Sequence, residues 1–195
     1  MWTRLRLLSG WAMVPVYLIF ARPTPILMAV GFAIALCGIF VRGWAAGAIR
    51  KNSELTTHGP YAFTRNPLYL GSFLLGLGVA IASGVIWILV VFVVFFAIVY
   101  GRTMRREETR LARLFSVEFE RYASAVPRFL PRPAPWSDVT GETSPARPAA
   151  AGVADSNAPA ARGPFQLKRY FAHREYQALL GLAAMFLLLV VKLML

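Results

Sequence analysis

The sequence predicts an all-α, polytopic membrane protein with about five transmembrane helices, including a short helical hairpin, and a cytoplasmic helical region. Of its 195 residues, 57% are hydrophobic, which is too apolar for an ordinary soluble domain. Several apolar runs approach or exceed the roughly 18 residues that a membrane helix needs. The net charge of +12 fits cytoplasmic loops that face anionic lipid. We therefore expect a membrane partner and no nucleic acid.

Two apolar segments open the chain. Residues 5–21 form the first, and we expect residues 1–24 to be an N-terminal transmembrane helix. Residues 25–49 form the second segment, which contains Gly43 and Gly47. Small residues at this spacing allow another helix to approach closely.

The third apolar segment predicts a hairpin. Residues 68–101 are apolar throughout, and as one helix they would extend about 51 Å, against a hydrocarbon core of about 30 Å. Ser83 and Gly84 mark the natural break. We therefore predict two short antiparallel helices, 67–82 and 85–101, joined by a tight turn.

The rest of the chain divides into three parts. Residues 102–130 resemble an amphipathic helical region, and residues 133–164 have the Pro, Ala, Gly, Ser and Thr content of a flexible linker. The C-terminal segment, 165–195, contains a last apolar run at 176–195, in which Lys192 can snorkel to the interface. The amphipathic pattern consists of Leu111, Leu114, Phe115, Phe119 and Tyr122.

The distribution of basic residues predicts the orientation. With five spans and the N-terminus inside, Arg22 and Lys192 are the only two of 21 Lys and Arg residues in outside segments. Basic residues favour the cytoplasmic side. Both polar regions, 50–66 and 102–175, are then cytoplasmic, and we expect a multi-pass protein whose active site faces the cytoplasm.

Metal and disulfide chemistry are not expected. Cys37 lies inside an apolar run, so there is no disulfide framework and no Cys-based zinc site. His58 and His173 are far apart in sequence.

The stretch HGPYAFTRNPLYLG, residues 58–71, carries more chemistry than a connecting loop needs. Asn66 is a good N-cap residue, and Pro67 suits the first helical position. The free N–H groups of that helix start, together with Arg65, would favour an anionic ligand. Alternatively, Arg65 marks the membrane edge and the Asn-Pro pair is only a cap.

Three further charged residues have two readings each. Glu107 and Glu108 either pair with neighbouring arginines at helical spacing or receive a cationic group of a ligand. Arg42 lies within an apolar run. An intramembrane charge is a functional-site hypothesis, but this arginine can also snorkel to the interface.

Two blocks carry a family resemblance. GPYAFTRNPLYLG is similar to a Gly-x-Tyr-x-x-x-Arg-His-Pro-x-Tyr-x-Gly motif, and EETRLARLFSVEFERYASAVPRFLPR is similar to a Glu-Glu-x-x-Leu block with a Val-Pro ending. The chain resembles the membrane methyltransferases related to isoprenylcysteine carboxyl methyltransferase and phospholipid N-methyltransferase. The resemblance covers a core at about residues 25–132. It departs from the family pattern at Asn66, where His is usual, and at Ser116, where Gly is usual.

The resemblance implies S-adenosylmethionine (SAM) as the methyl donor and a lipophilic acceptor, such as a prenylcysteine-like carboxylate or a phospholipid amine. Because the donor is already activated, transfer needs mainly positioning and desolvation. Arg42 or Arg128 would hold an acidic group of the acceptor. Phe115 and Phe119 would help to wall the adenine or the sulfonium. The residues implied to bind the cofactor are His58, Tyr61, Arg65, Asn66, Pro67, Leu68, Tyr69, Glu107, Glu108 and Tyr122.

Two alternatives belong to other classes. The chain could be a non-catalytic membrane protein that binds lipid or a partner, which Asn66 favours because an amide cannot act as a general base. It could also be a membrane reductase of the sterol type, which would bind a nicotinamide cofactor. The sequence leaves open the acceptor and the oligomeric state.

Overall fold

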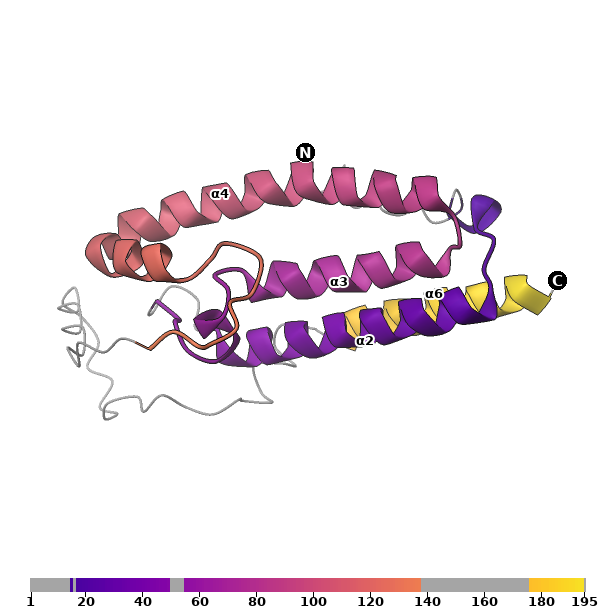
Figure 1. Cartoon of the computed structure of the whole chain (residues 1–195), viewed down its shortest axis with the longest axis horizontal. Helices are drawn as coiled ribbons and strands as arrows, with labels where there is room; N and C mark the ends of the chain where they lie inside the picture. Colours follow the sequence, from indigo (N-terminus) through magenta and orange to yellow (C-terminus); the bar gives the residue numbers. More distant parts are fainter. Residues whose placement is uncertain (1–14, 16, 50–54, 138–175, 195) are drawn as a thin grey trace, which may run out of the picture.

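A computed structural model describes residues 15, 17–49, 55–137 and 176–194. Every regular element in this part of the chain is a helix, which confirms the all-α prediction. These elements are α2 (Pro25–Ala48), the short 3-10 helix η1 (Gly59–Ala62), α3 (Pro67–Ala82), α4 (Ile86–Ala125) and α6 (Tyr176–Met194). The long helices lie side by side along the longest axis of the molecule (Figure 1).

The number of candidate membrane spans is smaller than predicted within the described residues. Helices α2, α4 and α6 are long and apolar enough to cross a membrane, and α3 is a shorter apolar helix. Most of the predicted first span, 5–21, lies outside the described residues. The described part of it is helical at residues 15 and 17–20. Most of the predicted linker also lies outside the described residues.

Helices α2 and α3 pack backbone against backbone. A Cβ atom added to Gly31 would lie 2.3 Å from the carbonyl oxygen of Gly78, so a side chain at either position would force the helices apart. The closest approach is therefore nearer the start of α2 than the sequence predicted, although Gly43 and Gly47 are buried as well. This packing fixes α3 firmly against α2 and leaves its other side towards α4.

The predicted break in the third apolar segment is confirmed. Helix α3 ends at Ala82, and Gly84 takes a φ of 70° in the turn that follows. This left-handed conformation favours glycine. Ser83 accepts a hydrogen bond at its carbonyl from the backbone N–H of Arg22 (2.6 Å), which holds the turn against the start of α2.

The second helix of the hairpin is longer than predicted. We expected it to end near residue 101, but α4 extends through the amphipathic region to Ala125, with a kink at Ser116. Arginines and glutamates are good helix formers, so the change from apolar to charged residues does not end the helix. Backbone angles are non-helical at Ser116, and the remaining turns fold back towards the start of α3 (Figure 1).

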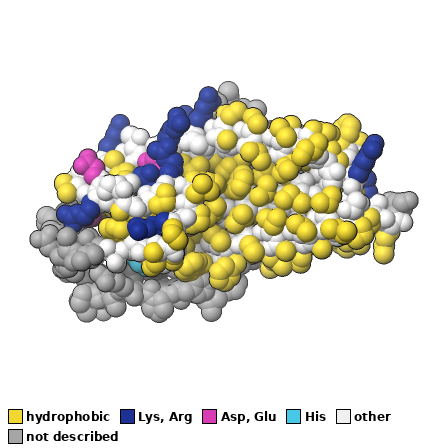
Figure 2. All heavy atoms as spheres, viewed as in Figure 1, with side chains coloured by type: hydrophobic (Ala, Val, Ile, Leu, Met, Phe, Trp, Pro, Cys, Tyr) yellow, Lys and Arg dark blue, Asp and Glu magenta, His cyan; other side chains and the backbone are white. Residues whose placement is uncertain are grey.

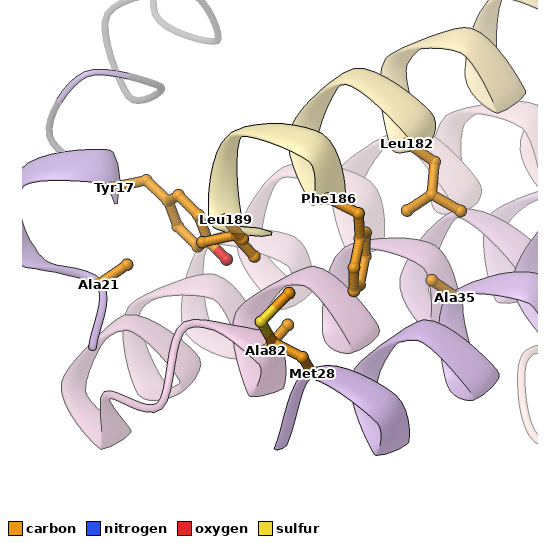
Figure 3. Packing of buried hydrophobic residues seen from close by; sticks show 8 residues of the cluster. All are labelled: Tyr17, Ala21, Met28, Ala35, Ala82, Leu182, Phe186 and Leu189. Carbon is orange, nitrogen blue, oxygen red and sulfur yellow. The ribbon is translucent and has the colours of Figure 1, made fainter. Parts of the chain in front are cut away.

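Helix α6 completes a small apolar core with α2, α3 and residues 17–21. Figure 3 shows Phe186 and Leu189 of α6 in the same cluster as Met28, Ala82 and Tyr17. Near the end of α6, the Nζ atom of Lys192 donates to the carbonyls of Leu18 and Ile19.

The surface has an apolar band and a polar end. In Figure 2 the hydrophobic side chains cover the middle of the molecule, with Lys and Arg side chains at its borders. Acidic side chains are visible only at the end where α4 folds back. The candidate site lies at this polar end.

Candidate active site

The loop before α3 is joined to the segment after α4 by backbone hydrogen bonds. Arg65 donates its backbone N–H to the carbonyl of Pro127 (3.0 Å), and Arg132 donates to the carbonyl of Phe63 (3.0 Å). The buried side chain of Thr64 donates to the carbonyl of Phe129 (3.0 Å). The two sequence blocks that carried the family resemblance are therefore in direct contact.

Two aromatic side chains extend this contact. The Tyr122 hydroxyl donates to the carbonyl of Tyr61 (2.6 Å), and the ring of Trp136 packs on Tyr122 with centroids 5.5 Å apart. The backbone N–H of Trp136 also donates to the carbonyl of Ala62 (2.9 Å). Trp136, near the predicted start of the linker, is thus held against the loop. Burial raises the pKa of the Tyr61 phenol above its usual value, so this side chain stays neutral at physiological pH.

An ion cluster lies where the two segments meet α4. Glu108 lies between two arginines: Nη2 of Arg128 is 2.7 Å from Oε2, and Nη1 of Arg65 is 3.5 Å from Oε1. The side chains of Glu108 and Arg65 are only 11% and 14% exposed. The Nε atom of Arg65 is buried and has no hydrogen-bond partner among the described residues. Buried donors are rarely left in this state.

A cavity of about 290 Å³ opens beside this cluster. Its volume is near the lower end of the range for small-molecule sites, about 300–1,000 Å³. Of the residues that the sequence singled out, Tyr61, Arg65, Asn66, Glu107, Glu108, Phe115, Phe119 and Tyr122 line it. His58, Pro67, Leu68, Tyr69, Arg42 and Arg128 do not line it.

The remaining lining residues are Ile49, Leu55, Thr56, Arg110, Leu111 and Leu114. Leu111 and Leu114 belong to the amphipathic pattern of the sequence, which therefore indicated the inward face of α4. Nothing in the sequence indicated Ile49, Leu55 or Thr56. Ile49 packs against Tyr61, and Leu55 packs against the cluster of Phe119 and Tyr122.

The two neighbouring glutamates have different surroundings. Glu108 is buried and bound by arginines, whereas Glu107 is exposed and accepts a hydrogen bond from the Tyr69 hydroxyl (2.9 Å). Neighbouring positions of a helix point about 100° apart. The cavity touches both carboxylates, but Glu107 is the more accessible one.

The predicted helix cap at Asn66 is only partly correct. Asn66 occupies the N-cap position and Pro67 begins α3, but the Asn66 side chain makes no cap hydrogen bond. Its Nδ2 atom donates instead to the carbonyl of Arg128 (2.9 Å). The side-chain amide of Asn66 therefore links the loop before α3 to the segment after α4.

Arg42 lies away from the cavity, between α2 and α3. Its Nη1 atom donates to the hydroxyl of Ser72, and a Cβ atom on Gly71 would meet its side chain. The guanidinium is thus placed about one and a half turns into α3. Among the described residues, no group of three or more His, Cys, Asp or Glu side chains is placed to hold a metal ion.

Comparison with known families agrees with this architecture. The family model of phospholipid methyltransferases matches residues 24–118, which include α2, the loop, α3 and α4 as far as the kink. The match covers just under half of the chain and confirms its resemblance to a family of membrane methyltransferases.

Two curated relatives carry names from metal resistance. The nickel-cobalt-cadmium resistance protein NccN of Alcaligenes xylosoxydans xylosoxydans is 34% identical over 96 residues, which are 49% of this chain and 42% of the relative. The cobalt-zinc-cadmium resistance protein CzcN of Cupriavidus metallidurans is 35% identical over 111 residues, 56% of this chain and 51% of the relative. The chain thus spans about half the length of these relatives. No solved structure matches it.

Proposed function

We propose that the protein transfers a methyl group from SAM to a lipophilic acceptor at the cytoplasmic face of a membrane. The observation that carries this proposal is the cavity at the polar end, which is lined by Arg65, Glu107 and several aromatic side chains. The phospholipid methyltransferase match over residues 24–118 supports the same class of reaction.

The charges of the cavity fit the amino-acid part of SAM. Its carboxylate requires a cationic donor, which Arg65 supplies. Its ammonium or a ribose hydroxyl requires an acceptor, and Glu107 is the accessible carboxylate on the same wall. Glu108, already bound by two arginines, is better suited to hold Arg65 in place than to bind the ligand itself.

Aromatic side chains fit the remaining part of the cofactor. Phe115, Phe119 and Tyr122 line the same cavity from α4, and Tyr61 lines it from the loop. Flat rings of this kind pack on an adenine and attract a sulfonium. When bound, SAM supplies a methyl group that is already activated, so the protein has to bind, orient and exclude water.

The orientation of the site is part of the proposal. Exposed arginines, among them Arg102, Arg105 and Arg106, follow the apolar part of α4 at the end that holds the cavity. At the opposite end the described chain has Arg22 and Lys192. This asymmetry supports a cytoplasmic cavity under the positive-inside rule.

The test is incubation of the purified protein with methyl-labelled SAM and total host lipids. We expect one labelled lipid product, whose formation is reduced at least about tenfold in Arg65→Ala. The matched control is Arg105→Ala, which removes an exposed arginine of α4 that does not line the cavity. If wild-type protein labels no lipid under conditions where it binds SAM, the proposed acceptor class is wrong.

A further inference from the structure

A second cavity lies between α3 and α4, within the apolar part of the molecule. Its volume is about 280 Å³. Ser72, Gly76 and Ala80 line it from one face of α3, and Ile88, Phe92 and Phe96 line it from α4. Both sets follow a four-residue spacing, so two continuous helix faces form the walls of one elongated cleft.

The cleft has the length of one lipid chain. Along α4 it extends from Trp87 to Tyr100, which is about 20 Å at 1.5 Å per residue. Half of the hydrocarbon core of a bilayer is about 15 Å thick, so the chain of a lipid in one leaflet fits within this length.

One end of the cleft has a positive charge beside it. Ser72 lines the cleft and accepts a hydrogen bond from Nη1 of Arg42. A guanidinium has five N–H donors, and its charge complements the phosphate of a lipid head group. Tyr100 lines the same end on α4, so the remaining length of the cleft extends into the apolar band.

Aromatic rings from α3, α4 and the segment after α4 pack together beside this cleft. Phe129, from the segment after α4, lies with its ring centroid 5.6 Å from Phe73 of α3 and 6.1 Å from Phe96 of α4. Tyr69 and Tyr100 form a second pair across the hairpin at 5.6 Å. Of these rings, Phe96 and Tyr100 line the apolar cleft, and none lines the polar cavity.

We propose that the cleft binds one hydrocarbon chain of an anionic membrane phospholipid, with the phosphate at the Arg42 end. A chain that leaves the bilayer for this cleft gains no hydrophobic energy, so binding depends on close packing and on the charge of Arg42. We therefore expect saturable binding with a preference for anionic head groups. That this lipid is also the methyl acceptor rests on the proposed function, whereas its binding does not.

Photo-crosslinking tests the proposal in nanodiscs that contain the full chain. The probe is phosphatidylglycerol with a diazirine in the middle of one acyl chain, at a low mole fraction in phosphatidylcholine. We expect saturable labelling of Val91 and Phe92, which line the cleft. Val90 and Val94 are exposed but do not line it, and we expect their labelling to be at least about fivefold weaker.

Two variants close the cleft from different sides. Ala80→Phe fills it from α3, and Val91→Trp narrows it from its lipid side. Each should reduce labelling of Phe92 at least about fivefold, while the matched control Val90→Phe leaves it unchanged. Arg42→Gln should remove the preference for phosphatidylglycerol over a phosphatidylcholine probe with the same diazirine chain. Helical content is followed by circular dichroism for every variant, and two independent closures keep the test valid if one of them misfolds.

The outcomes separate this inference from the proposed function. Equal labelling of Val90 and Val91 would show ordinary surrounding lipid and would overturn the inference. So would undiminished labelling of Phe92 in a folded Ala80→Phe or Val91→Trp variant. Because the probe needs no SAM, labelling of the cleft without any methyl transfer would leave this inference intact and remove only the proposed function.

Discussion

Arg128 binds the carboxylate of Glu108 through two nitrogen atoms. Its Nε atom donates to both carboxylate oxygens, at 3.0 and 2.9 Å, and its Nη2 atom lies 2.7 Å from Oε2. The two residues flank the kink at Ser116, so the ion pair holds the returning chain against the outer part of α4. The carbonyl of Arg128 is thereby placed where Asn66 donates to it.

The ion cluster predicts that substitutions of Glu108 and Arg128 reduce the free energy of unfolding by unequal amounts. Glu108→Ala leaves Arg65, with 14% of its side chain exposed, without its acidic partner, and should reduce the free energy of unfolding by about 2–4 kcal/mol. Arg128→Ala leaves Glu108 paired with Arg65 and removes a half-exposed partner, so we expect a loss of about 1 kcal/mol. Thermal unfolding in one detergent measures both, and equal losses would contradict the unequal roles.

The helices could be predicted from the sequence because apolar runs and turn residues are local signals. Ser83 and Gly84 marked the hairpin turn, and Pro67 marked the start of α3. The predicted end of α4 was wrong, because a helix can leave the membrane and continue when charged helix formers follow. Only the folded chain shows that the loop and the Arg128 segment exchange hydrogen bonds.

The same limit applies within the candidate site. Arg65 and Glu108 were expected at one site because a hairpin returns both to the same surface, and the structure brings them together. Their direct ion pair was not predicted, because a pattern of charges does not show which partners meet. Ile49 had no signal in the sequence, since its place in the cavity depends on the packing of the end of α2 against Tyr61.

Asn66 supplies a second prediction. Its Nδ2 atom donates to the carbonyl of Arg128, so Asn66→Ala leaves that acceptor without this partner and should cost about 1–2 kcal/mol of unfolding free energy. Asn66→Asp keeps the shape, but an ionised carboxylate cannot donate, so we expect a loss at least as large. Thermal unfolding distinguishes the variants from wild type, and an Asp variant as stable as wild type would rule out this role of the amide.

The packing of α2 on α3 gives a third prediction. A Cβ atom on Gly78 would lie 2.3 Å from the carbonyl oxygen of Gly31, so Gly78→Ala must push the helices apart. We expect a loss of about 2–3 kcal/mol, seen as a lower unfolding temperature. The matched control is Gly101→Ala in α4, where nothing lies within 4 Å, and which should be neutral or stabilising by up to about 1 kcal/mol.

The orientation gives a fourth prediction. In a background where Cys37 is replaced by Ser, we introduce single cysteines at Ile86, which is 73% exposed near the hairpin turn, and at exposed Arg105. A membrane-impermeant thiol reagent added to intact cells should label position 86 and miss position 105. Lysed cells serve as the control, in which both positions should react. The opposite pattern in intact cells would place the cavity outside the cytoplasm.

The last prediction concerns the two sides of the cofactor cavity. We expect Arg65→Ala to weaken SAM binding about ten- to a hundredfold, because charge-assisted hydrogen bonds contribute roughly 1.5–3 kcal/mol. Glu107→Gln should weaken it by a similar factor if Glu107 binds the ammonium group. Isothermal titration calorimetry in detergent measures both changes.

Two further variants identify which carboxylate contacts the ligand. Tyr69→Phe removes the hydrogen bond to Glu107 and should reduce SAM affinity less than Glu107→Gln, because the carboxylate itself remains. Arg105→Ala should leave the affinity unchanged. If Glu107→Gln binds SAM as tightly as wild type while Glu108→Gln does not, Glu108 must exchange its arginine partners for the ligand. If both glutamates are neutralised together in a folded protein and binding persists, the cavity beside Arg65 does not hold the amino-acid part of SAM.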